Sequence, residues 1–266
     1  MNFYNEFKRN CSEEINLCVG IDPSWEQLEA WGFDNSAAGA LKFGKTILSA
    51  AHGLVKVVKP QVAYFERLGP DGFRALASII SEAREQGFLV VADAKRGDIG
   101  STIDAYAQAW LGESAAFPVN AITANPYLGF NSLQPMLSRA ADSGSYVFVV
   151  ARSSNPEGTS IQMHGDPPMW HNVLDDIAEW CDKNNNHTVG AVVGATVVSD
   201  LEFSLQRLPH SLFLAPGIGR QGATTDSISS LKPYANRILL SASRSISDAG
   251  PKAESISLAI KSLLDI

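Results

Sequence analysis

Short apolar runs recur along the whole chain, and this pattern constrains the fold more than any other feature of the sequence. Each run is rich in Val, Ile or Leu and is nearly continuous, without regular polar residues between the apolar ones. Continuous apolar runs are typical of parallel strands that are buried on both faces. The predicted strands are Asn16–Ile21, Leu54–Val58, Phe88–Ala92, Val119–Thr123, Tyr146–Ala151, Thr188–Val193, Leu212–Ala215 and Arg237–Ser241.

Stretches with helical spacing lie between these runs. The clearest are Ala37–Ala51, Gly72–Glu85, Ser101–Leu111, Asn131–Ala141, Pro168–Lys183 and Ala253–Leu264. Strand and helix alternate about eight times, and eight parallel βα units close most simply into a (β/α)8 TIM barrel. The sequence therefore predicts an α/β protein with a single barrel domain over residues 1–266. A doubly wound open sheet is the alternative, which the lack of an obvious edge strand disfavours.

The composition indicates an acidic, soluble enzyme. Of the 266 residues 45% are hydrophobic, which is enough for a large core, and the formal net charge is −7. This charge disfavours partners such as nucleic acid or an anionic membrane. No apolar run approaches the ~20 residues that span a bilayer, and the amino-terminal segment does not resemble a signal peptide. Cys11, Cys18 and Cys181 form neither a disulfide framework nor a metal-binding pattern, so we expect a cytoplasmic protein.

A charged cluster, Asp93-Ala94-Lys95-Arg96-Gly97-Asp98, stands at the end of the third predicted strand. The period of two in a strand predicts that Asp93 and Lys95 point the same way. Gly97 then permits a sharp turn that would bring Asp98 back toward the same place. Such an array would hold a protonated lysine beside negative charge, although by itself it also fits a structural ion-pair network.

Polar residues follow other predicted strands as well, and in a barrel the carboxyl ends of the strands share one mouth. They are Asp22, Lys59, and the segments 123–127, 153–156, 216–222 and 241–245. The irregular stretch Ser153–Met169 is long enough to be a functional loop or lid, and residues 217–225 are a second candidate lid.

The last two polar segments predict a phosphate site. Glycine-rich backbone after the seventh and eighth strands of such barrels is a recurring phosphate cradle. Gln221 would supply an amide donor, and Arg244 would supply a guanidinium fork that matches phosphate oxygens. Gly217-x-Gly219-x-x-Gly222 also matches the dinucleotide fingerprint, but no acidic residue follows at the distance that binds a ribose.

Taken together, these residues resemble the orotidine 5′-monophosphate decarboxylase family over essentially the whole chain. The Lys59-Pro60-Gln61 and Ser154-Asn155-Pro156 motifs are most similar to those of the longer bacterial branch of that family. The D-x-K-x-x-D element alone is shared with related sugar-phosphate enzymes, whereas all five motifs in this order are specific. The motifs are Asp93-x-Lys95-x-x-Asp98-Ile99, Lys59-Pro60-Gln61 with Tyr64-Phe65-Glu66, Ser154-Asn155-Pro156, Pro216-Gly217-Ile218-Gly219 with Gln221, and Arg244-Ser245-Ile246.

The resemblance implies a cofactor-free enzyme without a metal, which converts orotidine 5′-monophosphate to UMP in pyrimidine biosynthesis. Lys95 would give a proton to C6 of the pyrimidine, beside Asp93. Lys59 would pair with Asp93 and, like Asp22, contact the ribose. Asp98 and Thr102 would serve the partner's active site in a homodimer. Ser154 would read the pyrimidine edge, and Gln221 and Arg244 would hold the phosphate of this small-molecule nucleotide.

Two positions depart from the family's pattern. Ser243 precedes Arg244 where many relatives carry glycine, and Glu157 follows Asn155-Pro156 where glycine is frequent. Neither change removes a group that the chemistry needs.

Three other functions stay open for the same residues. A metal-dependent sugar-phosphate lyase or synthase shares the D-x-K-x-x-D element. An aldolase would use Lys95 or Lys59 as a Schiff-base nucleophile. A phosphate-binding module would keep the pocket without turnover.

Overall fold

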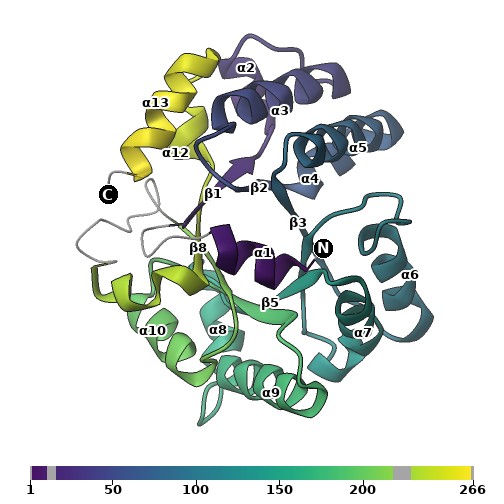
Figure 1. Cartoon of the computed structure of the whole chain (residues 1–266), viewed down its shortest axis with the longest axis vertical. Coiled ribbons are helices and arrows are strands. Elements are labelled where there is room, and N and C mark those ends of the chain that lie inside the picture. Colours follow the sequence, from purple (N-terminus) through teal and green to yellow (C-terminus); the bar gives the residue numbers. More distant parts are fainter. Residues whose placement is uncertain (1, 11–15, 218–228, 265–266) are drawn as a thin grey trace. The chain divides into compact units, whose positions relative to one another are not determined.

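Eight parallel strands form a closed barrel in the order of the sequence, β1 to β8 (Figure 1). The structure is a computed structural model that describes residues 2–10, 16–217 and 229–264. The predicted (β/α)8 TIM barrel is therefore confirmed. The strands are β1 (Asn16–Ile21), β2 (Val57–Pro60), β3 (Leu89–Arg96), β4 (Ala121–Ala124), β5 (Tyr146–Arg152), β6 (Val189–Val193), β7 (Phe213–Pro216) and β8 (Ile238–Ala242).

Helices follow the strands, and several match the predicted ranges closely. Of the predicted helices, α3 and α13 have the expected bounds, and α5, α6, α7 and α9 differ at one or both ends. The spacing did not reveal helices α1, α2, α4, α8, α10 and α12. The α-helices are α1 (Phe3–Asn10), α2 (Trp25–Ala30), α3 (Ala37–Ala51), α4 (Val62–Glu66), α5 (Gly69–Glu85), α6 (Gly100–Trp110), α7 (Gln134–Ser143), α8 (Thr159–Gln162), α9 (Met169–Asn184), α10 (Val198–Arg207), α12 (Arg244–Ser247) and α13 (Ala253–Leu264). Short 3₁₀ segments are η1 (Phe130–Leu133), η2 (Pro156–Gly158) and η3 (Ser229–Arg237).

Contacts within the chain group its residues into two compact units. The first unit comprises Met1–Asn16 and Lys95–Leu240, and the second comprises Leu17–Ala94 and Ser241–Ile266. A single domain over residues 1–266 stays a prediction.

In the second unit, β1 pairs with β2 and β2 with β3, all in parallel. Helix α3 packs against both α5 and α13. It is capped at its amino end by Ser36, whose hydroxyl accepts a hydrogen bond from the Gly39 N–H over 3.2 Å. Side-chain caps of this kind satisfy a backbone donor that the first helical turn leaves free.

In the first unit, β4 to β7 pair in parallel, and α1 lies beside β5 in Figure 1. Phe3 and Phe7 of α1 are 1% and 0% exposed. The Phe3 ring packs against Tyr146 and Phe148 of β5, at centroid distances of 5.4 and 6.0 Å. The Tyr146 hydroxyl accepts a hydrogen bond from the buried Leu212 N–H over 2.8 Å. The short helix α1 therefore gains its stability from tertiary packing, as expected below three turns.

The predicted bounds of the second and third strands are wrong, and the difference changes where polar residues lie. Leu54 and Val55 do not begin β2, because both of their N–H groups donate to the Ala51 carbonyl in a turn that follows α3. Instead β2 extends through Lys59, and β3 extends through Lys95. Polar residues that were expected after these strands therefore lie inside them.

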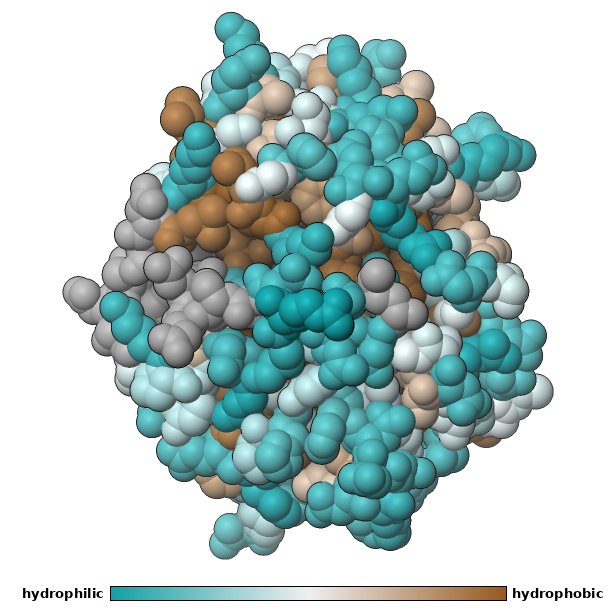
Figure 2. All heavy atoms as spheres, viewed as in Figure 1, coloured by the Kyte–Doolittle hydropathy of each residue, from teal (hydrophilic) through white to brown (hydrophobic). Residues whose placement is uncertain are grey.

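The outer surface of the first unit carries amphipathic helices. Figure 2 shows hydrophilic side chains over α9, at the bottom of the view, while Leu174 and Ile177 on the same helix are fully buried. Along the described part of the chain, no helix combines the length and the apolar character needed to cross a membrane.

Candidate functional site

The predicted site residues divide between the two units. Asp22 directly follows β1, Lys59 lies in β2, Asp93 lies in β3 and Arg244 begins α12, all in the second unit. In the first unit, Lys95 lies in β3, Asp98 precedes α6, Thr102 lies in its first turn and Ser154 follows β5. Gln221 lies outside the described residues, as does the candidate lid 217–225 apart from Gly217.

A buried ion pair joins β2 to β3 in the second unit. The Lys59 Nζ donates to Asp93 Oδ2 over 3.1 Å, as the resemblance implied. The two residues are 4% and 7% exposed. Gln61 Nε2 donates to the same oxygen over 3.2 Å, and Gln61 forms a bridge with Asp93 just beyond the end of β2. Two donors thus fix the direction of one carboxylate oxygen.

The electrostatic environment keeps Lys59 charged. Burial is the largest single effect and by itself would lower the pKa of the Lys59 ammonium. The charges of Asp93, Asp22 and Cys18, with the hydrogen bond to Asp93, together outweigh burial, so the pKa of Lys59 is raised above its ordinary value. Opposite charge at short range favours the ionised form. Lys59 is therefore a fixed cation in this unit.

Tyr64 of α4 is a further member of this group, with no role predicted from the sequence. Burial raises the pKa of the Tyr64 phenol, and Asp22 and Glu26 raise it further, whereas Arg244 and Lys59 lower it. Tyr64 therefore lies within electrostatic range of three predicted site residues that come from separate elements. Its position five residues after Lys59, in a motif of the family, was the only signal for it.

Arg244 and Ser243 follow β8, and both are part of the second unit. Arg244 is exposed at the start of α12, while the Ser243 hydroxyl occupies the space beside Gly20 of β1. A Cβ atom on Gly20 would lie 1.8 Å from Ser243 Oγ and 3.1 Å from Asp22 Oδ1. Gly20 thus makes room for the serine that departs from the family's pattern.

Lys95 in the first unit has an unusual backbone. Its φ is 45°, in the left-handed region that residues with a side chain rarely adopt. Its N–H donates to Thr123 Oγ1 over 2.9 Å, and its side chain is exposed. The alternation of an extended strand does not hold at this residue, so it stays a prediction that Asp93 and Lys95 point the same way. Strained backbone of this kind persists where the surroundings fix it, often at functional sites.

The turn after Lys95 is packed against the end of β4. Asn125 N donates to the Arg96 carbonyl over 2.8 Å, and a Cβ on Gly97 would lie 2.3 Å from the Asn125 carbonyl oxygen. Asp98 Oδ1 accepts a hydrogen bond from the Ile99 N–H over 2.8 Å. Gly97 is therefore needed for the close approach to Asn125, whereas the sharp turn that would bring Asp98 back stays a prediction.

Ser154 is exposed and stands at the head of the segment between β5 and α9. Its backbone packs on Gly194, where an added Cβ would lie 3.1 Å from Ser154 N. The predicted irregular segment Ser153–Met169 contains two short helical turns, η2 and α8. It is therefore more ordered than its composition indicated.

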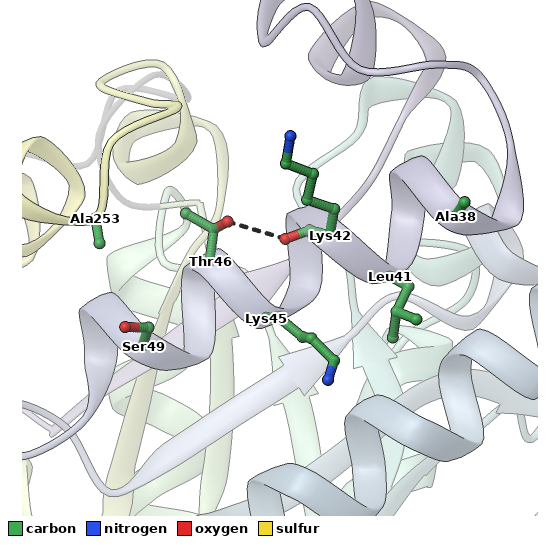
Figure 3. Close-up of a pocket in the computed structure, with 7 residues that line it drawn as sticks. All are labelled: Ala38, Leu41, Lys42, Lys45, Thr46, Ser49 and Ala253. Atoms are coloured by element: carbon green, nitrogen blue, oxygen red, sulfur yellow. Dashed lines mark hydrogen bonds between the residues drawn. The ribbon is translucent and has the colours of Figure 1, made fainter.

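A cavity of about 560 Å³ on the outer face of α3 is not this site (Figure 3). It is lined by residues of α3 and by Ala253 of α13. Lys45, one of its two lysines, pairs with Glu82 over 3.0 Å, and the other, Lys42, lies over the Phe33 ring at 4.2 Å. Both cations already have partners, and no predicted site residue lines the cavity.

Comparison with known proteins identifies the family. The sequence model of the "Orotidine 5'-phosphate decarboxylase / HUMPS family" matches residues 15–258. The chain is 38% identical to orotidine 5′-phosphate decarboxylase of Myxococcus xanthus over 97% of this chain and 92% of that protein. It is 42% identical to the enzyme of that name from Streptomyces coelicolor over 84% of this chain and 81% of that protein.

Solved structures agree with these matches. A crystal structure from Streptomyces avermitilis has a TM-score of 0.90 and 36% identity, and covers 99% of this chain and 94% of that one. Leishmania donovani OMP decarboxylase has a TM-score of 0.78 and 31% identity, over 100% of this chain and 97% of that one. The chain therefore belongs to the orotidine 5′-phosphate decarboxylase / HUMPS family and is an enzyme of the carboxy-lyase class.

Proposed function

We propose that this enzyme decarboxylates orotidine 5′-monophosphate to UMP, a step of pyrimidine biosynthesis in the cytoplasm, without a cofactor. The observation that carries the proposal is the buried pair of Lys59 and Asp93. Asp93 stands two residues before Lys95 and begins the D-x-K-x-x-D motif. The relatives that match nearly the whole chain bear the name of this activity.

The reaction needs a group that stabilises a carbanion. The bond between C6 and the carboxylate breaks, CO₂ leaves, and the electron pair stays on C6. In the proposal the Lys95 ammonium stabilises this charge and then gives its proton to C6, so that UMP forms and solvent restores the proton to the lysine. A cation placed beside C6 favours the transition state, in which negative charge develops on C6, over the ground state, in which that charge lies on the carboxylate.

The Asp93 carboxylate faces the departing carboxylate of the substrate in this proposal. Its Oδ2 is held by Lys59 Nζ and Gln61 Nε2, which supports a fixed orientation for the group. Lys59 stays protonated, since nearby carboxylates raise its pKa. We assign Lys59 and Asp22 to the ribose.

The remaining groups bind the ends of the nucleotide. Arg244 and Gln221 would hold the phosphate, and Ser154 would contact the pyrimidine edge. Exposed positions of Arg244 and Ser154 are compatible with ligand contact. Binding energy from the phosphate, remote from C6, would contribute to the rate of the chemical step.

A second copy of the chain is part of the proposal. Asp98 and Thr102 would reach the partner's active site in a homodimer. Large apolar side chains are exposed next to Asp98 in the chain and after β4, since Ile99 is 61%, Tyr127 73% and Leu128 55% exposed. Large exposed apolar side chains are typical of a surface that another protein covers.

An absorbance assay with orotidine 5′-monophosphate tests the proposal. We expect loss of the orotidylate absorbance, formation of UMP, and the same rate with and without a chelator. Activity that disappears with the chelator would favour the metal-dependent sugar-phosphate enzyme instead, and binding without turnover would favour a phosphate-binding module. Among the described residues, no group of three His, Cys, Asp or Glu side chains is arranged to hold a metal ion.

A borohydride experiment tests the aldolase alternative. A Schiff base between Lys95 or Lys59 and a carbonyl substrate would be trapped as a covalent adduct. We expect no adduct with either lysine.

A further inference from the structure

Every polar atom of Ser153, the residue before Ser154, is hydrogen-bonded within the first unit. Its N–H donates to Gln162 Oε1 over 3.0 Å, and its carbonyl accepts from Arg152 Nη1 over 2.9 Å. Its hydroxyl accepts from Gln162 Nε2 over 2.8 Å and donates to Asn155 Oδ1 over 2.6 Å. Backbone and side chain of Ser153 are thus both fixed, which sets the direction in which the chain enters Ser154.

Arg152 connects this arrangement to α10. Its side chain is 11% exposed, and its Nε pairs with Asp200 Oδ2 over 2.9 Å. Its Nη1 also donates to Gln162 Oε1 over 3.2 Å. A guanidinium presents several donors in a fixed plane, so one arginine can hold a strand end, a loop residue and a helix at once. Asp200 supplies the opposite charge that such a buried cation requires.

The strand end itself is bent at this place. The register of β5 against β6 shifts, because Val150 pairs with Val192 whereas Arg152 pairs with Val193. A bulge of this kind changes the direction of the side chains that follow. Gly194 N donates to the Arg152 carbonyl over 2.9 Å. Ser154 therefore lies between a bulged strand end and the backbone of Gly194.

We propose that Gln162 and Arg152 are positioning residues that hold Ser154 where it reads the base of the substrate. This inference rests on the proposed function, in which Ser154 contacts the pyrimidine. Gln162 belongs to α8, eight residues further along the segment between β5 and α9, and it binds Ser153 through both ends of its amide. Ser154 is exposed, yet the residue before it has no polar atom left to adjust. Preorganised groups of this kind bind a ligand without the cost of ordering a loop.

The test compares ligands with and without a base. In Gln162→Ala we expect kcat/KM for orotidine 5′-monophosphate to fall about 10- to 100-fold, as misplacement of a binding group by ~1 Å does. The inhibition constant of UMP rises similarly, whereas that of ribose 5-phosphate, which has no base, stays within about twofold. Gln162→Glu keeps most of the activity, because its carboxylate accepts from the Ser153 N–H and from Arg152, and the Ser153 hydroxyl turns its proton from Asn155 Oδ1 to this carboxylate.

The matched control is Gln134→Ala, which removes the same amide and one hydrogen bond, to Ser138 on α7. We expect the control to leave the kinetics unchanged. If Gln162→Ala is too unstable to assay, Gln162→Asn, which shortens the side chain, replaces it. We expect Gln162→Asn to raise the inhibition constant of UMP and to leave that of ribose 5-phosphate within about twofold.

A double-mutant cycle tests whether Gln162 acts through Ser154. Added to Ser154→Ala, the change Gln162→Ala lowers kcat/KM by no more than about a further twofold if the two residues act as one unit. The inference is overturned if the effects of the two changes on kcat/KM are fully additive, or if the binding of UMP and of ribose 5-phosphate weakens equally. Either result would mean that Gln162→Ala loosens the site as a whole and does not act through Ser154. If the wild-type enzyme does not turn over orotidylate, the proposed function itself is wrong, and this result is obtained without any variant.

Discussion

The ammonium of Lys59 and the carboxylate of Asp93 meet over 3.1 Å, although their side chains are only 5% and 9% exposed. The two residues come from neighbouring strands and are 34 positions apart in the chain. Removal of one partner from such a pair leaves a buried charge without compensation, and this costs more than removal of both.

We therefore expect Lys59→Met to lower the free energy of unfolding by about 3–5 kcal/mol, as breaking a buried pair does. The double variant Lys59→Met/Asp93→Leu loses less than Lys59→Met alone. Urea unfolding of the three proteins measures the difference. Lys45→Met breaks the exposed pair with Glu82 and is the control, with an expected loss of about 1 kcal/mol or less. Equal losses for the single and double variants would show that the pair is not coupled.

Substitutions of Lys95 are expected to remove activity without unfolding the protein. Lys95→Ala and Lys95→Gly both abolish orotidylate turnover, because the proton donor is gone, while the protein stays folded. Since φ is 45° at this position, Lys95→Gly is more stable than Lys95→Ala by about 1 kcal/mol. Thermal unfolding gives the comparison of stabilities. Substantial turnover in either variant would remove Lys95 from the centre of the mechanism.

Arg244→Ala is expected to weaken phosphate binding. The KM for orotidine 5′-monophosphate and the inhibition constant of ribose 5-phosphate both rise by at least about tenfold, since a charged hydrogen bond contributes about 1.5–3 kcal/mol. Arg74→Ala, which removes an exposed arginine of α5, is the control and leaves both constants unchanged. An unchanged kcat/KM in Arg244→Ala would exclude the assigned role.

Gly20 and Ser243 are expected to be coupled through steric exclusion. In Gly20→Ala the new Cβ would lie 2.7 Å from Ser243 Cβ, so we expect a loss of about 1–3 kcal/mol from overpacking. Adding Ser243→Gly removes the obstacle and restores most of the stability. Chemical unfolding of the single and double variants measures the effect, and a double variant no more stable than Gly20→Ala would contradict this account.

Ile99→Asp is expected to disrupt the proposed homodimer. A charge at a position that the partner covers costs desolvation, so sedimentation velocity should show monomers where the wild type is dimeric, with lower activity in the monomer. Leu258→Asp changes an apolar side chain of α13 that is 67% exposed, and serves as the control that stays dimeric. A wild-type protein that sediments as a monomer would refute the proposed assembly.

Some features were predictable from the sequence because they depend on burial and on local spacing. Strand β1 and helices α3 and α13 have the predicted bounds, since strands buried on both faces leave continuous apolar runs and amphipathic helices leave a period near 3.6. The family motifs identified the candidate residues by type and order. Helix α1 was missed because its buried Phe3 packs against Tyr146 and Phe148 of β5, more than 130 positions away.

The sequence by itself determined the barrel, the family and the residues with the chemistry for the site. Only the tertiary structure decided that Lys59 lies buried inside β2 and not after it, that Lys95 has a left-handed backbone, and that Gln162 holds the residue before Ser154. The physical reason is that apolar periodicity depends only on residues that are close together in the sequence. Burial of a charge, backbone strain and a shared hydrogen-bond network depend on partners that only folding brings within reach.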